Sequence, residues 1–378
     1  MTQGGEMADF IVIGAGMAGA SVAAELARDA RVILLERETQ PGYHTTGRSA
    51  ALFTVAYGPS VIRALSRASH AFYRGEGPGN PPPGLIRPRG ALFIGRSDQA
   101  ADIAALHRDL GEAVTPLSAA AARDLVPLLR PGYVASALFD RSAADIEVHG
   151  LHQYYLKSFR ARDGALHLKT EVLGVVRDGE GWRVETPGGP LRAPVVINAA
   201  GAWADEMARM AGLRPLGLRP LRRTALLVAA PVDVVPDAWP MVVDAAENFY
   251  LKPDAGKLLL SPADQTPSVP CDAQPDEIDV AICVDRIETA FDLQVRRIEH
   301  KWAGLRSFLS DGSPAVGYDP KAPGFFWLAG QGGYGIQTAP ALARAAAALA
   351  LGDPLPADVE AEGVTEAQLS PARPGLAA

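Results

Sequence analysis

The sequence of 378 residues contains only two cysteines, Cys271 and Cys283, so it can build neither a disulfide framework nor a four-cysteine zinc site. It also lacks the roughly 18 consecutive apolar residues that a membrane span requires, and its first residues lack the basic stretch of a signal peptide. Basic residues are outnumbered, and the net charge of −7 argues against a nucleic-acid partner. We therefore expect a cytoplasmic protein.

The composition is that of a folded protein with a large core, because 48% of the residues are apolar and only 21% are charged. At roughly 100–200 residues per domain, this length predicts two domains. Between Gly75 and Gly90, ten of sixteen residues are glycine or proline, which predicts a loop and a domain boundary.

A strand–turn–helix–strand unit is expected at the start of the chain. Residues 9–13 and 31–36 are apolar runs typical of buried strands, and Gly14-x-Gly16-x-x-Gly19 opens the alanine-rich helix between them. Glu36 lies 22 residues beyond Gly14. In dinucleotide-binding proteins such glycines form a tight turn at the pyrophosphate, and such an acid binds the ribose. Glu36 favours NAD or FAD over NADP; the motif leaves NAD and FAD open, and a packing turn without a ligand is the alternative.

Two further glycine turns follow expected strands at 194–200 and 324–329, and expected helices cover residues 116–130, 147–160, 204–212 and 338–351. Another strand is expected over residues 166–176, and the polar, proline-rich residues 261–277 are expected to form a surface excursion. Because such units lie at both ends and in the middle of the chain, one domain is expected to be assembled from discontinuous segments. His149 and His152 stand three residues apart on an expected helix, but two imidazoles without a third ligand do not make a metal site, so no metal is expected.

Four segments resemble the flavin-dependent D-amino-acid oxidase and dehydrogenase family, which includes glycine and sarcosine oxidases: residues 40–51, 197–208, 302–317 and 329–340. Within that family the pattern is most similar to bacterial D-arginine dehydrogenases. The resemblance implies non-covalent FAD and an α/β fold (α+β overall). It implies a Rossmann-like FAD-binding domain built from residues 1–75, 145–215 and 300–378. Residues 76–144 and 216–299 would form a β-sheet-rich substrate-binding domain.

The resemblance also implies which residues surround FAD. They are Gly14, Gly16, Met17, Ala18, Gly19, Glu36, Arg37, Thr46, Gly47, Arg48, Ser49, Ala50, Val172, Ala199, Gly201, Trp203, Gly304, Arg306, Gly332, Gly333, Tyr334, Gly335, Ile336, Gln337 and Thr338.

The implied reaction transfers a hydride from the Cα of a D-amino acid to flavin N5, and water then hydrolyses the imine to a 2-keto acid and ammonia. Such an enzyme must hold the substrate carboxylate, for which arginine is suited because its planar fork donates two parallel bonds. Arg223 and Arg306 lie in apolar surroundings and match the family's carboxylate-binding arginines. Tyr57 and Tyr250 match its active-site tyrosines, and Gly333 and Gln337 are expected beside them. The expected electron acceptor is a quinone or a dye.

The expected substrate pocket includes Leu52, Thr54 and Gly90. Leu52 and Gly90 replace a histidine and a glutamate of the D-arginine dehydrogenase pattern, so apolar or uncharged side chains are expected to be preferred over D-arginine. Oxidation of glycine, N-methyl amino acids or 2-hydroxy acids stays an alternative, as do an NAD-linked dehydrogenase and a non-catalytic flavoprotein. The base that deprotonates the substrate is open between His44 and water.

Overall fold

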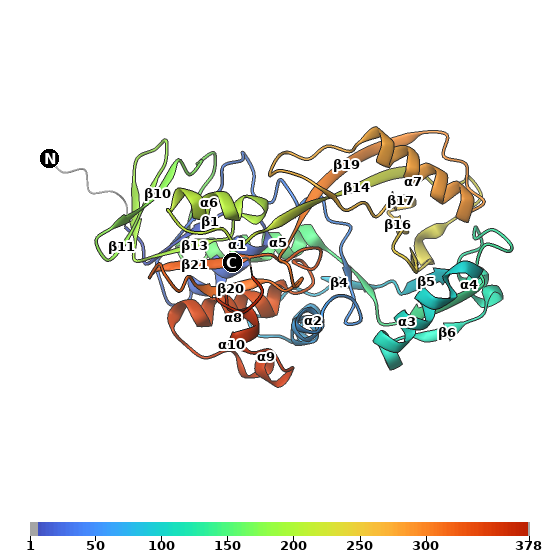
Figure 1. Ribbon diagram of the computed structural model, residues 1–378, viewed down its shortest axis with the longest axis horizontal. Coiled ribbons are helices and arrows are strands. Elements are labelled where there is room, and N and C mark those ends of the chain that lie inside the picture. Colours follow the sequence, from blue (N-terminus) through green and yellow to red (C-terminus); the bar gives the residue numbers. More distant parts are fainter. Residues whose placement is uncertain (1–6, 377–378) are drawn as a thin grey trace.

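The computed structural model describes residues 7–376 of the chain. Two large sheets organise it, one at each end of the elongated molecule (Figure 1). The strands of the first sheet, in spatial order, are β20 (Ala315–Tyr318), β21 (Phe325–Ala329), β13 (Val195–Asn198), β1 (Phe10–Ile13), β2 (Val32–Leu35) and β9 (Ala165–His167). All neighbours pair in parallel except β20 and β21. The strands expected around residues 9–13, 31–36, 194–200 and 324–329 are confirmed.

The first sheet is buried on both faces, which explains why its strands are continuous apolar runs. Along β1, Phe10 and Val12 belong to one core, whereas Ile11 and Ile13 belong to the other. One face carries helices: α1 (Met17–Leu26), α2 (Ser60–Tyr73), α5 (Val148–Arg160), α8 (Ala339–Leu351), α9 (Ala357–Ala361) and α10 (Glu366–Leu369). The other face carries α6 (Ala204–Met210) and a small sheet of β10 (Gly174–Asp178), β11 (Gly181–Glu185) and β12 (Leu191–Ala193).

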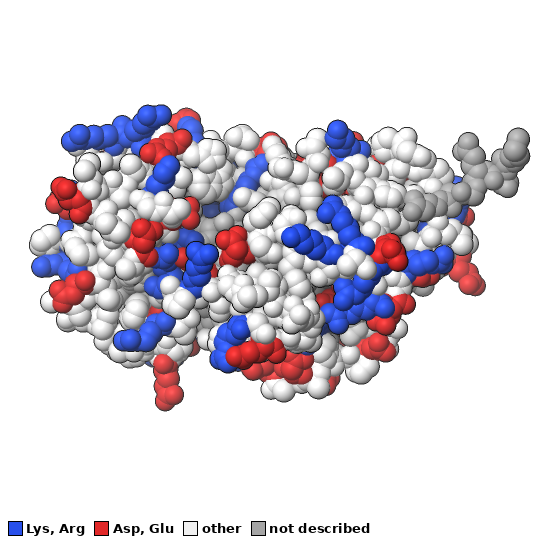
Figure 2. All heavy atoms as spheres, turned by 180° about the vertical axis from the view of Figure 1, so that it is seen from behind, with Lys and Arg blue, Asp and Glu red and all other residues white. Residues whose placement is uncertain are grey.

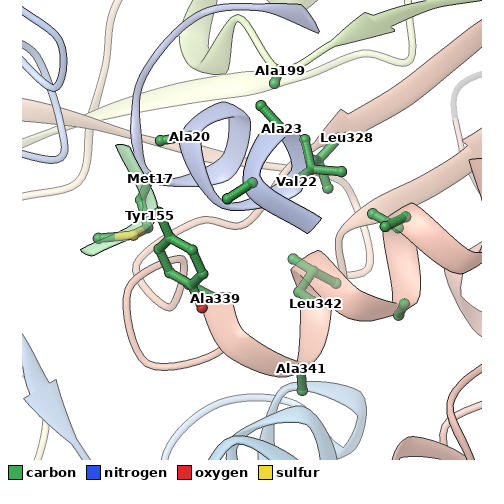
Figure 3. Packing of buried hydrophobic residues seen from close by; sticks show 14 of the residues in the cluster. Met17, Ala20, Val22, Ala23, Tyr155, Ala199, Leu328, Ala339, Ala341 and Leu342 are labelled. Atoms are coloured by element: carbon green, nitrogen blue, oxygen red, sulfur yellow. The ribbon is translucent and has the colours of Figure 1, made fainter. Parts of the chain in front are cut away.

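Small side chains let α1 approach its neighbours closely. Figure 3 shows how α1 packs between Ala199, which directly follows β13, and Leu342 of α8. The α1 residues between them are Ala20, Val22 and Ala23, and Tyr155 of α5 lies beside them. Burial of this face, at about 25 cal/mol per Å² of apolar surface, holds α1 and the glycine turn that precedes it in place.

The second large sheet is mainly antiparallel. Its strands are β18 (Thr266–Pro267), β14 (Arg219–Ala229), β17 (Lys257–Ser261), β16 (Tyr250–Asp254), β15 (Met241–Asp244), β5 (Ala91–Gly95), β7 (Ser136–Asp140) and β6 (Thr115–Leu117), with β19 (Ile298–Phe308) paired to β14. The helices α3 (Ala100–Leu110), α4 (Ala119–Leu125) and α7 (Glu277–Ala290) pack against it. A small sheet of β3 (Leu52–Phe53), β8 (Ala144–Ile146) and β4 (Ile86–Pro88) lies between the two parts. Short 3-10 turns span Ser97–Gln99, Gly111–Ala113, Gly201–Trp203 and Pro236–Ala238.

Three local expectations need correction. The helix expected over residues 116–130 is only α4, because Pro127 disfavours the helical conformation of Val126. The strand expected over residues 166–176 is divided into β9 and β10. The helix α7 directly follows the polar 261–277 segment and was not expected at all.

The division into two domains stays a prediction, and the sheets bear on its boundaries. The first sheet takes its strands from the segments expected to bind FAD, and the second takes most of its strands from those expected to bind substrate. Residues 300–308 are an exception: they were assigned to the FAD-binding domain, but they belong to β19 of the second sheet.

No helix within residues 7–376 is both long and apolar enough to cross a membrane. Cys271 and Cys283 are both free thiols, and only Cys283 is buried. On the face shown in Figure 2, basic and acidic side chains are interspersed over the described residues, so the charge of this face is locally balanced.

Candidate active site

A large cavity begins at the carboxyl ends of β1 and β2 and extends to the pair β14 and β19. Its empty volume, including the opening to solvent, is about 1750 Å³. In doubly wound sheets this end of the strands is where nucleotide ligands bind.

The turn after β1 requires glycine at positions 14 and 19. Gly14 has a φ of +100°, and a Cβ on Gly19 would lie 1.8 Å from the carbonyl oxygen of Gly14. A side chain at Gly19 would therefore push α1 away from β1. At the start of α1, the Met17 amide donates to Thr46 Oγ1 at 2.9 Å, which ties residues 42–49 to the glycine turn.

Glu36 lies at the carboxyl end of β2, next to this turn. One carboxylate oxygen accepts a hydrogen bond from the Ala15 amide at 3.0 Å, and the other accepts one from the Glu38 amide at 3.0 Å. Its side chain is thereby fixed on the wall of the cavity, with lone pairs left to receive ribose hydroxyls. This is the arrangement predicted from the spacing of the acid.

Around the same end of the cavity, Arg37 stacks 4.1 Å above the Trp203 ring. His44 lies beside both residues, with Nε2 2.8 Å from Glu38 Oε1. His44 lines the larger cavity, where Glu38 holds it, and it does not line the smaller cavity described below.

The segment 45–48 joins the nucleotide end of the cavity to the second sheet. Thr45 Oγ1 donates to the Leu305 carbonyl, Arg48 Nη1 donates to the Ala303 carbonyl, and Trp302 Nε1 donates to the Arg48 carbonyl. Since Leu305 and Ala303 lie on β19, the segment 45–48 and the strand that carries Arg306 are positioned by the same hydrogen bonds.

Pairing of β14 with β19 brings Arg223 and Arg306 together. Leu221 lies opposite Arg306, and Arg223 lies opposite Gly304. Because side chains two residues apart on a strand share one face, Arg223 and Arg306 are diagonal neighbours on the same face of the sheet. Gly333 leaves room for Arg306, because a Cβ on Gly333 would lie 3.0 Å from Arg306 Nη1.

The two arginines form an uncompensated positive site. Among residues 7–376 neither guanidinium has a salt bridge, and the buried Nε of Arg223 has no hydrogen-bond partner. Burial and the neighbouring Arg306 lower the pKa of Arg223, whereas Tyr250, Tyr57 and Asp264 oppose that shift. Such a pair is chemically suited to an incoming carboxylate, which would supply both the charge and the acceptor atoms.

A smaller cavity lies next to the arginines, both of which also line it, and its empty volume, including the opening to solvent, is about 830 Å³. Its walls are mainly apolar, with Leu52, Phe93, Met241 and Val243 among them. Burial raises the pKa of Tyr57 far above its ordinary value, and the charge of Glu247 adds to this shift, so the phenol stays a hydrogen-bond donor. Gln337 also lines this cavity, and its amide donates to Ser66 Oγ at 2.9 Å.

Most of the predicted residues meet at these two cavities. Those that line the larger one are Gly14, Gly16, Met17, Ala18, Glu36, Arg37, Thr46, Arg48, Ser49, Ala50, Val172, Ala199, Gly201, Trp203, Arg223, Tyr250, Gly304, Arg306, Gly332, Gly333, Gly335 and Ile336. Leu52, Thr54, Tyr57 and Gln337 line the smaller one, as do Ser49, Ala50, Arg223, Tyr250, Arg306, Gly333 and Ile336.

Five predicted residues lie outside both linings: Gly19, Gly47, Gly90, Tyr334 and Thr338. Gly19 has the packing role expected of it. Gly90 has a φ of +74°, and a Cβ there would point at the Phe139 ring, 2.7 Å away. Tyr334 packs edge-on against Tyr57, and the buried Thr338 donates its hydroxyl to the Tyr334 carbonyl. These residues support the site without facing its space.

Among the wall residues of the smaller cavity that were not predicted from the sequence are Phe93, Met241, Val243 and Glu247. The first three belong to strands whose apolar pattern does not distinguish cavity walls from core. For Glu247 a signal was present, because an acidic residue stands three positions before the predicted Tyr250.

Comparison with known proteins agrees with this geometry. A family model described as FAD dependent oxidoreductase matches residues 9–349. The chain belongs to this family. This FAD-dependent oxidoreductase has a cavity whose residues fit the cofactor: a glycine turn at a helix start and a fixed acid, Glu36, beside it. The choice between NAD and FAD is thereby decided for FAD.

The oxidoreductase is 27% identical to glycine oxidase from Geobacillus kaustophilus over 347 residues, with 88% of this chain and 90% of the relative covered. It is 29% identical to glycine oxidase from Pseudomonas aeruginosa over 376 residues, with coverages of 92% and 97%. These relatives do not support the particular likeness to D-arginine dehydrogenases that the sequence suggested.

Solved structures confirm the expected fold. The G. kaustophilus glycine oxidase superposes with a TM-score of 0.78 at 24% identity and covers 92% of this oxidoreductase and 95% of its own chain. L-α-glycerophosphate oxidase from Mycoplasma pneumoniae with FAD bound gives a TM-score of 0.81 at 16% identity, with coverages of 92% and 95%. The α/β fold class is that of these neighbours.

Proposed function

We propose that this oxidoreductase oxidises D-amino acids with apolar or uncharged side chains at Cα and yields a 2-keto acid and ammonia after hydrolysis of the imine. The observation that carries the proposal is the pair Arg223 and Arg306, which lies where the two cavities meet and has no salt-bridge partner among residues 7–376. FAD, when bound, supplies the two-electron acceptor for this chemistry.

The residues around this pair have defined tasks. Arg223 and Arg306 bind the α-carboxylate and so fix the orientation of the α-carbon. Tyr57 and Tyr250 line the same space, and the raised pKa of Tyr57 keeps its hydroxyl protonated as a donor. Leu52 and Phe93 exclude water from the substrate side chain.

The smaller cavity supports a substrate with a substantial side chain. Glycine has no side chain, and the apolar walls that Leu52, Phe93 and Val243 form beside the arginines would be left without a use. Arg87 and Arg89 do not line this space, and Arg89 is bound to Asp145, so neither favours an acidic substrate. The D configuration and a quinone or dye as electron acceptor are proposed from the sequence resemblance.

Oxidation of glycine or an N-methyl amino acid is the second candidate. It is favoured by the relatives named glycine oxidase, which cover most of this chain. Both candidates use the same carboxylate-binding arginines, so the two differ only in what occupies the smaller cavity.

The test is anaerobic mixing of the FAD-loaded protein with D-amino acids, L-amino acids, glycine and N-methylglycine, while bleaching of the flavin absorbance is followed. We expect D-methionine and D-leucine to reduce the flavin faster than glycine and D-arginine. Faster reduction by glycine or N-methylglycine than by any D-amino acid would establish the second candidate instead. A flavin that no amino acid bleaches would refute both.

A further inference from the structure

An acidic side chain on the wall of the smaller cavity has no role in the steps described so far. Glu247 lies in the turn between β15 and β16 and lines this cavity. Its φ is +54°, in the left-handed region that non-glycine residues rarely occupy. Such a conformation costs on the order of 1–3 kcal/mol and persists only where the surrounding structure fixes it.

The structure fixes this turn through a buried acid. Asp244 accepts hydrogen bonds from the amides of Ala246 and Asn248 at 3.1 and 3.2 Å, from Asn248 Nδ2 at 2.8 Å and from Gln99 Nε2 at 3.0 Å. The Glu247 amide donates to the Asp244 carbonyl at 2.8 Å. Three backbone amides of the turn are therefore bound to Asp244, which fixes the position from which the Glu247 side chain extends.

The carboxylate of Glu247 is not neutralised by a neighbour. Among residues 7–376 it takes part in no side-chain hydrogen bond and no salt bridge. Its charge instead acts on Tyr57 and Tyr334, where it adds to the effect of burial and raises the pKa of both phenols. Unpaired carboxylates on a partly buried wall are unfavourable for stability, so a role in binding explains why this one is kept.

Its surroundings define what the carboxylate meets. Of the described residues that line the smaller cavity, Glu247 alone is acidic, and the remaining wall is mainly apolar. A substrate held by Arg223 and Arg306 at its α-carboxylate extends its side chain into this space. A carboxylate on that side chain would share the smaller cavity with the carboxylate of Glu247. Between apolar walls, water screens the repulsion of two like charges poorly.

We propose that Glu247 is a specificity-determining residue that rejects amino acids with an acidic side chain and admits those with a neutral one. The inference rests on the proposed function of the site, which it deepens by adding a charge filter to the apolar cavity. Repulsion of a wrong partner by a like charge is a general device for specificity.

Glutamine and glutamate are the sharpest pair of probes, because they have nearly the same shape and differ in one charge. We expect the wild-type protein to use D-glutamine at least ~10-fold better than D-glutamate in kcat/KM, and Glu247→Gln to reduce this ratio by at least ~10-fold, which is about 1.4 kcal/mol. Glu247→Gly also removes the carboxylate and relieves the left-handed strain, so it should shift the ratio in the same direction.

The matched control is Glu112→Gln, which makes the same chemical change at an exposed position in the turn after α3. It should leave the ratio as in the wild type. An unchanged ratio in both Glu247 variants would overturn the inference, whereas a loss confined to Glu247→Gly and absent from Glu247→Gln would assign the effect to relief of backbone strain and likewise overturn it.

Ligand binding provides a second readout that does not depend on turnover. Butyrate and glutarate are titrated into the FAD-loaded protein, and the perturbation of the flavin absorbance gives their dissociation constants. Glutarate should bind at least ~10-fold more tightly to Glu247→Gln than to the wild type, relative to butyrate. If no amino acid reduces the flavin, the proposed function fails, and this titration then decides the inference about Glu247 by itself.

Discussion

Replacement of Arg223 by methionine should weaken substrate binding without weakening the fold. Methionine keeps an unbranched stem of similar length but removes the guanidinium. The Nε of Arg223 is buried without a partner, so its loss leaves no neighbouring group unsatisfied. Function and stability are therefore expected to change in opposite directions, which is typical of residues kept for binding.

The expected stability change follows from the strand pairing. Diagonal neighbours such as Arg223 and Arg306 have α-carbons roughly 7–8 Å apart, and two unit charges at that distance repel by about 2 kcal/mol at an effective dielectric constant of about 20. Because Arg223 is half-buried, solvent screening reduces this to about 1 kcal/mol. Arg223→Met should therefore raise the thermal unfolding midpoint by about 1–3 °C or leave it unchanged.

The expected functional change is much larger. Removal of one partner of a close charge pair costs about 2–5 kcal/mol, and Arg306 retains part of the binding, so the lower end applies. At about 1.4 kcal/mol per factor of ten, kcat/KM for D-methionine should fall by at least ~30-fold, mainly through KM.

The assays are steady-state kinetics with a dye acceptor and thermal unfolding of the FAD-loaded protein. Arg219→Met is the control, because Arg219 lies exposed at the start of the same strand, β14. It should change neither quantity. The reasoning would be refuted if the Arg223→Met variant kept the wild-type kcat/KM, or if its unfolding midpoint lay more than about 3 °C below that of the wild type.

Three further variants test the rest of the site. Gly333→Ala places a Cβ 3.0 Å from Arg306 Nη1, so KM for the amino acid should rise about 10-fold, whereas Gly188→Ala, with only Thr186 Oγ1 at 3.8 Å, should have no effect on KM. Gly19→Ala should reduce the flavin-to-protein absorbance ratio of the purified protein, because its Cβ would lie 1.8 Å from the Gly14 carbonyl oxygen. The control is Gly174→Ala, whose Cβ would lie 3.5 Å from the Glu185 side chain. Full FAD content in Gly19→Ala would contradict the packing argument. Burial lowers the pKa of His152 below its ordinary value of 6.5. Just below pH 6.5 the unfolded chain therefore binds a proton at this histidine that the folded chain does not bind. The stability that is present above pH 6.5 is consequently lost as the pH falls below 6.5. His152→Gln should flatten the fall in the unfolding midpoint between about pH 7 and 5, and an unaltered slope would exclude this histidine as its source.

The nucleotide end of the site was predictable from sequence because its parts are local. The strand, glycine turn, helix and Glu36 all lie within residues 9–36, and their spacing alone determines which atoms meet. The buried strands at 195–198 and 325–329 were likewise recognisable, since central strands of a parallel sheet are continuous apolar runs.

The substrate end depended on knowledge of which strands pair. Arg223 and Arg306 become neighbours only because β14 and β19 run antiparallel in one particular register, and a shift of that register by one residue would turn the two side chains to opposite faces. Gly90 was placed at the substrate by resemblance, whereas its positive φ and the Phe139 ring hold it outside the lining.

What the sequence by itself determined was the strand–turn–helix–strand unit at the start of the chain, because the short-range spacing of glycines, apolar runs and one acid specifies it. The family and FAD followed from the resemblance of longer segments, which the match over residues 9–349 confirmed. Only the tertiary structure decided the shape and charge of the substrate cavity. Its walls come from strands far apart in the chain, and Glu247 reaches it through a left-handed turn held by the buried Asp244. Such long-range contacts follow from packing of the whole sheet, and no local pattern encodes them.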